Sequence, residues 1–157
     1  MKLVRSDKDR FVFELSKRER ALLFEVLKLY PLIPKTSSAL QRGASKQKVA
    51  PDQQLLEQAL NEQRRENRQL LEAMLREPER FTEKQGRLEL TLTTAQMEWL
   101  LQVLNDIRVG SWLLLGSPDA KQEHKMALTP DNAIYYGAME LSALFQMRLL
   151  KAFDQRL

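Results

Sequence analysis

The sequence predicts a mostly helical α+β fold with four main helices. A small antiparallel sheet is expected, formed by the N-terminal strands and the strand 87–92. Apolar residues recur at every second position in two short segments, which is typical of strands with one buried face. A helix-capping pair follows each of these segments, and residues 52–77 contain no glycine or proline. We expect all 157 residues to form a single domain, 1–157.

Two expected strands begin the chain. Phe11, Phe13 and Leu15 occupy alternate positions, so their side chains share one face of a strand. The sequence Asp7-Lys8-Asp9 before them predicts a tight turn from a shorter strand over residues 2–5. The N-terminus is therefore predicted to be a β-hairpin.

A capped helix is predicted after this hairpin. Ser16 and Glu19 have the capping-box spacing, in which each side chain binds a backbone N–H at the helix start. Pro31 ends the helix. Its expected buried face contains five apolar residues: Leu22, Leu23, Val26, Leu27 and Tyr30.

Residues 31–51 are predicted to be a mobile loop. The segment is polar and contains proline, serine and glycine, which favour turns over regular structure. The segment is long for a structureless connection, so a short helix near residues 38–42 is the alternative.

The long helix predicted over residues 52–77 ends at Pro78. Spacings of four and three residues, typical of a coiled-coil seam, relate six positions: Leu56, Leu60, Gln63, Asn67, Leu70 and Met74. Residues 61–69 contain no apolar side chain, so the simpler interpretation is that the centre of this helix is solvated. The alternative is a helix pair in which Asn67 sets the register.

The second half of the chain is predicted to contain one strand and two helices. Leu88, Leu90 and Leu92 alternate with polar residues in the strand 87–92. Thr93 and Gln96 then form a second capping box, and the helix is expected to continue to residue 115. After a loop over 116–128, the last helix is expected to begin at Thr129-Pro130-Asp131, with proline at its first position.

A shift of 77 residues superposes the two strand–helix segments, for example Phe13 on Leu90 and Ser16 on Thr93. The simpler explanation is that any strand followed by a capped helix has these periods. Duplication of the segment is the alternative. Both explanations predict two similar units whose strands share one sheet.

The chain lacks cysteine and has a single histidine, which excludes thiol chemistry, disulfides and metal sites built from two histidines. His124 lies in a polar loop, where we expect a solvated side chain rather than a general base. No phosphate-binding glycine loop or nucleophile motif is present among the five glycines. The sequence therefore predicts no catalytic residue, metal or cofactor.

A group of polar residues interrupts the apolar helix that follows Thr93. We expect Asp106 and Arg108 to be partly buried, so both need partners from other elements. Arg148 is one candidate partner for Asp106, and Glu140 is a candidate partner for Arg108. A structural clasp is the simpler interpretation, and an enzyme site with a carboxylate and an arginine is the alternative. The candidate cluster is Asn105, Asp106, Arg108, Glu140 and Arg148.

The excess of positive charge lies in the loop 31–51. The chain has 25 Lys and Arg against 21 Asp and Glu, a net charge of +4. Four basic residues in this loop account for that excess, because the loop has no acidic residue: Lys35, Arg42, Lys46 and Lys48. Such an arm can contact phosphates weakly, although it has no aromatic residues for base stacking. A solvated loop is the simpler interpretation.

The helix around Trp99 resembles an uncharacterised bacterial family, a domain of unknown function. In some lineages that family is encoded beside the adaptor that delivers substrates to the Clp protease. The resemblance rests on Trp99, on Leu104-Asn105-Asp106-Ile107-Arg108 and on the Leu-Gly end at residues 113–116. Tyr135 and Tyr136 match the aromatic start of the family's last helix.

This resemblance covers roughly the last 60 of the 157 residues. The chain departs from the family at Gly110-Ser111-Trp112, where members more often continue Leu-Gly-x-Arg-Leu, and in its long polar helix 52–77. The family has no established activity. The resemblance therefore implies a fold and a regulatory setting.

Three functions remain open at this level. The first is a non-enzymatic protein-interaction or regulatory module, acting on another protein or as a homodimer. The alternatives are a nucleic-acid-associated protein using residues 35–48 and an enzyme using the carboxylate/arginine cluster. Residues 1–10 lack the apolar stretch of a signal peptide, and no window has the apolar length of a membrane span, so a cytoplasmic location is expected.

Overall fold

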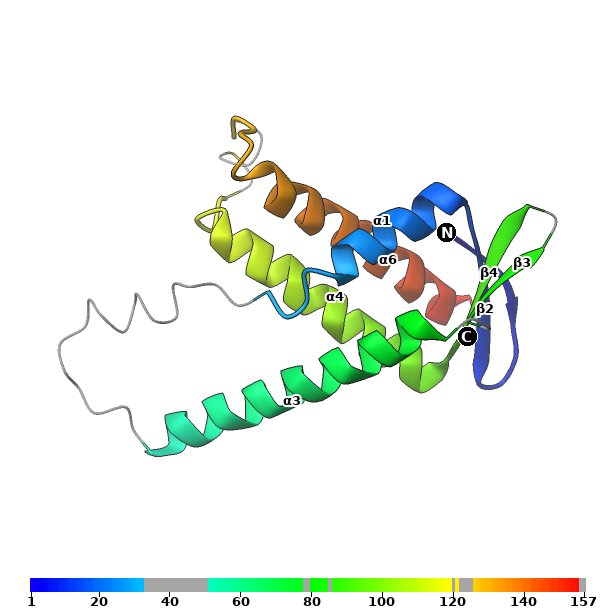
Figure 1. Cartoon of the computed structure of the whole chain (residues 1–157), viewed down its shortest axis with the longest axis horizontal. Coiled ribbons are helices and arrows are strands. Elements are labelled where there is room, and N and C mark those ends of the chain that lie inside the picture. The colour runs from blue at the N-terminus through cyan, green and yellow to red at the C-terminus, as the bar shows by residue number, and fades with distance from the viewer. Residues whose placement is uncertain (33–50, 78–79, 85, 120, 122–125, 156–157) are drawn as a thin grey trace.

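The computed structural model describes residues 1–32, 51–77, 80–84, 86–119, 121 and 126–155 (Figure 1). As predicted, it is a mostly helical α+β fold with a small antiparallel sheet. The described residues form four strands and four main helices: β1 (Lys2–Ser6), β2 (Arg10–Leu15), α1 (Lys17–Leu27), α3 (Pro51–Arg76), β3 (Phe81–Lys84), β4 (Arg87–Thr93), α4 (Thr94–Leu114) and α6 (Ala133–Asp154). Residues 33–50, which make up most of the predicted loop 31–51 and all of its alternative short helix, lie outside the described residues, and Pro51 is the first residue of α3.

The four strands form one antiparallel sheet in the order β1-β2-β4-β3. Phe11, Phe13 and Leu15 are buried, which confirms the strand β2, but Val12, which points to the opposite face, is buried as well. The strand predicted at 87–92 is β4, and Phe13 lies opposite Leu90 in the register between β2 and β4. These side chains form the inner face of the sheet, against which the helices pack.

The strand β3 was not predicted. It pairs with β4 through Phe81 opposite Leu90 and Lys84 opposite Arg87. Phe81 is its only apolar residue and is itself only half-buried. A period-two pattern cannot form around a single apolar side chain, so the sequence carries no signal for this edge strand.

Both capped helices begin as predicted. The Ser16 hydroxyl accepts from the Glu19 N–H and the Thr93 hydroxyl accepts from the Gln96 N–H, at 3.1 and 3.2 Å. The helix α1 ends at Leu27, earlier than the predicted limit at Tyr30. The N–H groups of Leu29 and Tyr30 bind carbonyls three residues back, a tighter turn that ends the α-helical pattern.

The predicted start of the last helix at Thr129-Pro130-Asp131 is wrong, because α6 begins at Ala133. The Asn132 side chain closes a turn before the helix. Its Oδ1 accepts from the Thr129 N–H at 2.8 Å, and its Nδ2 donates to the Ala127 carbonyl at 3.0 Å. Asparagine commonly closes such local turns, and here the turn takes the place of the first helical residues.

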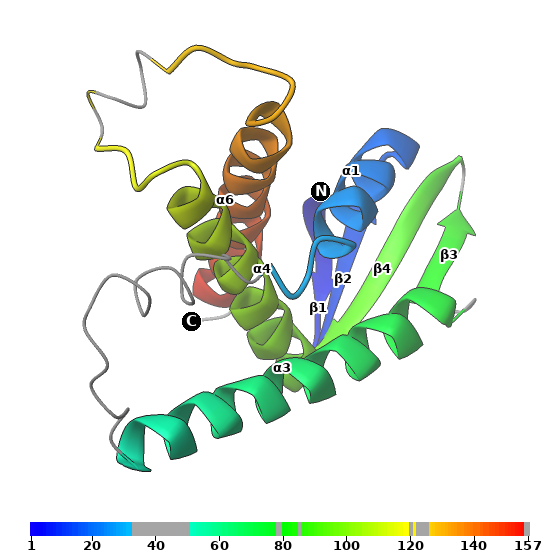
Figure 2. The same cartoon turned by 60° about the vertical axis from the view of Figure 1, so that its left-hand side comes forward.

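The helices α1, α4 and α6 supply most of the helical side chains of the core, and α3, which crosses the lower edge of this body (Figure 2), adds Leu71 and Met74. In both views the N-terminal half of α3 projects away from the rest of the molecule (Figures 1 and 2). The core contains side chains from the sheet and from each of the three inner helices, among them Leu90, Leu27, Leu104 and Leu149.

Within the described residues, both halves of the chain contain the same order of elements. Each has a β-hairpin, a capped helix and then a long helix: β1-β2-α1-α3 in the first half and β3-β4-α4-α6 in the second. The sheet order β1-β2-β4-β3 is symmetric about the boundary between β2 and β4. Phe13 and Leu90, which the shift of 77 residues superposes, lie opposite each other at that boundary. The correspondence thus includes a hairpin and a long helix that capping and strand periods alone do not require.

Candidate functional site

The side of α3 that packs onto the body contains Asn67, Leu71 and Met74, all buried. They are spaced by four and three residues, so they lie on one side of the helix. Leu70, which the sequence placed in the seam, is 57% exposed, so Leu71 takes its place. The residues around the centre of α3 are mostly exposed, as predicted, but the solvated interpretation is wrong for Asn67.

Asn67 connects α3 to two other parts of the chain. The Trp99 indole N–H on α4 donates to Asn67 Oδ1 at 3.0 Å. The Asn67 amide donates to the Tyr30 hydroxyl at 3.4 Å. Burial raises the pKa of Tyr30, and the bond from Asn67 acts against that rise. Asn67 therefore fixes the position of α3 through partners in its own chain, where the sequence had left a second helix as an alternative.

A polar cleft of about 440 Å³ lies between α3 and α4. Asp106 is half-buried there, and burial raises the pKa of its carboxyl, while Arg64 on α3 acts in the opposite direction. One carboxylate and one guanidinium face this cleft, with amides around them. Its lining residues are Leu60, Gln63, Arg64, Asn67, Leu101, Gln102, Asn105 and Asp106.

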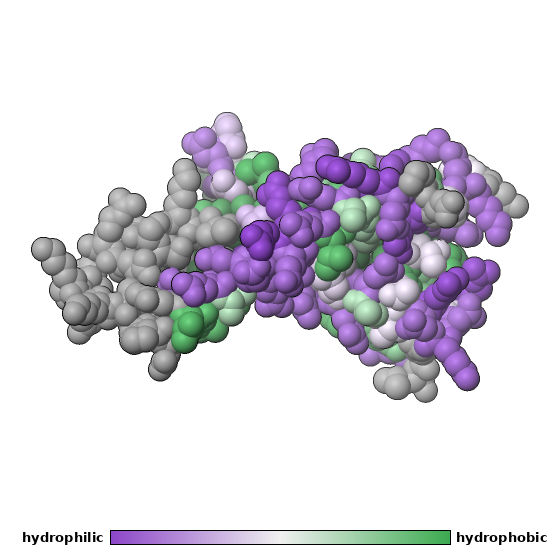
Figure 3. Space-filling model, turned by 60° about the horizontal axis from the view of Figure 1, so that its bottom comes forward, coloured by the Kyte–Doolittle hydropathy of each residue, from purple (hydrophilic) through white to green (hydrophobic). Residues whose placement is uncertain are grey.

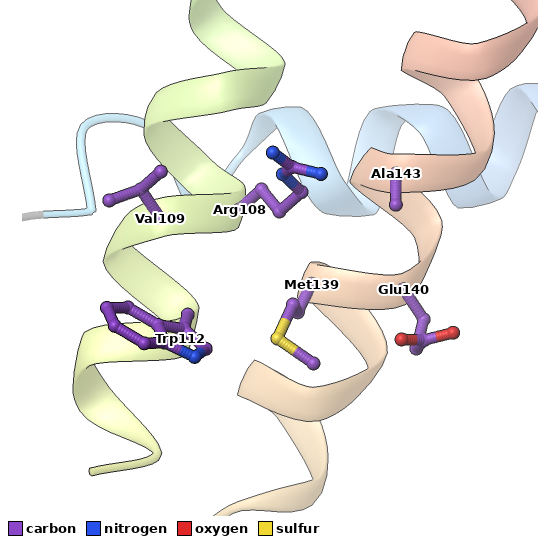
Figure 4. Close-up of a pocket in the computed structure, with 6 residues that line it drawn as sticks. All are labelled: Arg108, Val109, Trp112, Met139, Glu140 and Ala143. Carbon is purple, nitrogen blue, oxygen red and sulfur yellow. The ribbon is translucent and has the colours of Figure 1, made fainter. Parts of the chain in front are cut away.

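A second groove, of about 350 Å³, lies between α4 and α6 (Figure 4). Three of its residues come from α4 and three from α6: Arg108, Val109, Trp112, Met139, Glu140 and Ala143. The Trp112 N–H donates to the Pro118 carbonyl at 3.0 Å, which holds the indole while leaving the side chain partly exposed. Figure 4 shows Val109 and Trp112 along α4, with the Met139 side chain between the two helices.

The predicted contact between Asp106 and Arg148 is wrong. The helices α4 and α6 run antiparallel (Figure 1). The Gln146 side chain on α6 donates to the Leu101 carbonyl on α4 at 3.3 Å. In that register Arg148 lies level with the residues just before Leu101, roughly seven residues or about 10 Å along α4 from Asp106. Arg148 instead lines a hollow at the sheet with Met1, Glu14 and Arg87, among others.

The register set by Gln146 and Leu101 places Arg108 and Glu140 at similar levels of the two helices, but Arg108 is exposed rather than partly buried as predicted. They line the same groove, but within the described part of the chain no ion pair joins them. In Figure 4 the Arg108 side chain reaches toward α6, whereas Glu140 projects from the other side of that helix. The five residues of the predicted cluster therefore occupy three separate places, and Asn105 lies with Asp106 in the α3–α4 cleft.

Several other predicted features cannot be placed. The basic residues Lys35, Arg42, Lys46 and Lys48 lie outside the described residues, and so does His124. In the part of the chain that the structure describes, no group of three His, Cys, Asp or Glu residues could hold a metal ion. Among the described helices, none has the length and apolar character needed to cross a lipid bilayer.

Comparisons with known proteins find no match: no protein-family model, no curated protein and no solved structure is similar to this chain. The resemblance of the Trp99–Arg108 segment to a bacterial family therefore stays a prediction. The structure adds that Trp99 binds Asn67, whereas Asp106 and Arg108 face different grooves.

Proposed function

We propose that this protein is a non-enzymatic protein-interaction module whose partner docks in the α4–α6 groove. The observation that carries the proposal is an exposed, mostly apolar groove with a tryptophan held at its edge. Trp112 and Val109 are 39% and 41% exposed. Tryptophan contributes disproportionately to protein interfaces because it buries a large area at little entropic cost.

The apolar surface continues along α6 beyond the groove. Met139, Ala143, Met147 and Leu150 recur at spacings of four and three residues, so they lie on one side of that helix. Met147 is 56% exposed and Leu150 is 52% exposed. A contiguous apolar strip on a folded surface marks a site of contact more often than single exposed leucines do.

The placement of the polar side chains supports interaction over catalysis. In a catalytic site, the general acid or base and the groups that assist it must all lie within hydrogen-bond reach of the reacting group. Asp106 and Arg108 face different grooves, and Arg148 lies at the sheet. We place the proposed module in the cytoplasm with a regulatory or adaptor-like role, as the sequence predicts.

The test is affinity capture from a cell extract with the full chain, before and after nuclease treatment. We expect the wild type to retain a defined set of proteins, and Trp112→Glu to lose them. Leu128→Glu is the matched control, because Leu128 is 62% exposed and lies outside both helices of the groove. Thermal unfolding of both variants checks that each is folded.

Two results would contradict the proposal. One is equal capture by the wild type and Trp112→Glu. The other is loss of all captured material on nuclease treatment, which would favour the nucleic-acid alternative that the loop charges suggest.

A further inference from the structure

The α4–α6 groove contains one positive and one negative side chain in an otherwise apolar surface. Arg108 comes from α4 and Glu140 from α6, and both are exposed. Neither forms an ion pair with another residue in the part of the chain that the structure describes. The described lining of this groove therefore carries one charge of each sign.

A surface with one charge of each sign is complementary to itself. In a two-fold dimer the same patch meets its own copy, so if residue i contacts residue j of the partner, residue j contacts residue i. A two-fold axis through the groove would bring Arg108 of each copy to Glu140 of the other. The apolar residues of α4, including Trp112, would then pack against α6 of the partner, and Ala143 against α4 of the partner.

The size of this face is consistent with such a dimer. Helices of 21 and 22 residues are about 32 Å long and, side by side, about 20 Å wide. The projected face is then about 600 Å², close to the roughly 800 Å² of accessible surface that each partner loses in a standard interface. Two such helix pairs packed face to face make a four-helix arrangement, a common way to bury apolar helix surfaces.

We infer that the partner docked in the α4–α6 groove is a second copy of this chain, with reciprocal Arg108–Glu140 ion pairs across a two-fold axis. This inference rests on the proposed docking function of the same groove. It names the partner that the proposed function leaves open.

The free end of α3 is the competing surface for a second copy. Figure 3 shows hydrophobic side chains at that end, where Leu55, Leu56 and Leu60 are exposed. Around the helix, Glu57 and Arg64 lie beside Leu60, and Glu62 lies beside Leu55. Burying that face would desolvate more charge than burying the α4–α6 groove, so the groove is favoured.

The experiment is sedimentation equilibrium on the full chain and on two charge-reversal variants, Arg108→Glu and Glu140→Arg. We expect the wild type to dimerise. Each variant alone places two like-charge contacts in its homodimer, so its dimer dissociation constant should rise at least about tenfold. An equimolar mixture of the two variants should dimerise like the wild type, because the heterodimer restores both opposite-charge contacts.

Recovery in the mixture is specific to reciprocal pairing, since a merely unfolded or destabilised variant does not recover. A monomeric wild type at high concentration overturns the inference, as does a mixture no stronger than either variant alone. Loss of the dimer in Leu56→Glu but not in Arg108→Glu would place the interface on α3 instead. The chain could instead be monomeric while Trp112→Glu still loses proteins captured from the extract. In that case the inference of a dimer fails, but the proposed docking function of the groove stands.

Discussion

The two halves of the molecule have the same order of elements, but their helices pack differently. In the second half α4 has 21 residues and packs along α6. In the first half α1 has only 11 residues and ends at Leu27. The long helix α3 therefore has no equivalent support, and among its described side chains, from residue 55 onward, the buried ones lie in the C-terminal half, from Asn67 on.

This difference shows how the length of one capped helix decides what the next helix can do. Where the capped helix is long, the result is a helix pair with an exposed outer groove. Where it is short, the following helix projects and leaves a polar cleft beside α4 (Figure 2). The same order of elements thus produces two different surfaces, one mostly apolar and one mostly polar.

The largest expected change in the free energy of unfolding comes from truncating one buried side chain of each half at the sheet. It tests whether the two halves contribute equally there. Phe13 and Leu90 are fully buried and lie opposite each other at the centre of the sheet. We expect Phe13→Ala to lower the free energy of unfolding by about 3–5 kcal/mol and Leu90→Ala by about 2–5 kcal/mol. Urea denaturation measures both. Val4→Ala, at a side chain that is 46% exposed on the edge strand, is the control and should change little.

A smaller change in the free energy of unfolding is expected when α3 loses the side chain that bonds it to α4. Asn67→Ala leaves the partly buried Trp99 N–H without its acceptor, so we expect a loss of about 1–3 kcal/mol in the free energy of unfolding. Gln69→Ala, at an exposed position on the same helix, should be nearly neutral. Hydrogen exchange of α3 amides should rise in the Asn67 variant only. Equal exchange in both variants would show that Asn67 does not hold the helix.

Substitution of alanine for the two helical glycines of the second half, Gly110 and Gly137, should change the stability of the fold in opposite directions. A Cβ at Gly110 would lie 2.6 Å from the Leu32 carbonyl oxygen, whereas nothing lies within 4 Å of a Cβ at Gly137. We expect Gly110→Ala to destabilise the fold by about 1–3 kcal/mol. Gly137→Ala should stabilise it by up to about 1 kcal/mol, because alanine favours the helix. Thermal melts of both variants give the sign, and a stable Gly110→Ala would show that the chain at Leu32 moves easily.

The smallest effect concerns pH and the polar cleft. Burial raises the pKa of Asp106 above its ordinary value of 3.8, with Arg64 acting against the rise. For an acid whose folded pKa is raised, its contribution to stability is fully present below the unfolded pKa and is lost as pH rises through the folded pKa. Ionised Asp106 therefore weakens the fold at neutral pH.

We expect Asp106→Asn to be more stable than the wild type at pH 7, with the advantage shrinking as pH falls toward 4. Urea titrations across that range measure the difference. Glu98→Gln, at an exposed carboxyl on the same helix, is the control. A destabilised Asp106→Asn would instead show that the attraction between Asp106 and Arg64 outweighs the cost of burying the carboxylate.

The sequence predicted those features that repeat within a single element. Alternation at Phe11 and Phe13 identified β2, and the Ser16 and Thr93 capping boxes located two helix starts. The strand β3 has no such repeat. The contact of Arg148 could not be predicted, because the register of α6 on α4 depends on packing between helices rather than on spacing within either. The sequence identified Asn67 only as a position in the heptad seam, and its simpler interpretation was solvated. Its bonding partners could not be predicted, because they lie 32 and 37 residues away along the chain.

The chain has two tryptophans, and both lie on α4. The indole of Trp99 is bonded to α3 and that of Trp112 to the loop after α4, so the two rings face different surfaces. A variant that keeps only Trp99 would carry a fluorophore sensitive to the attachment of α3. One that keeps only Trp112 would respond to occupancy of the groove. The two tryptophans can therefore serve as separate fluorescence probes, Trp99 for the contact between α3 and α4 and Trp112 for the α4–α6 groove.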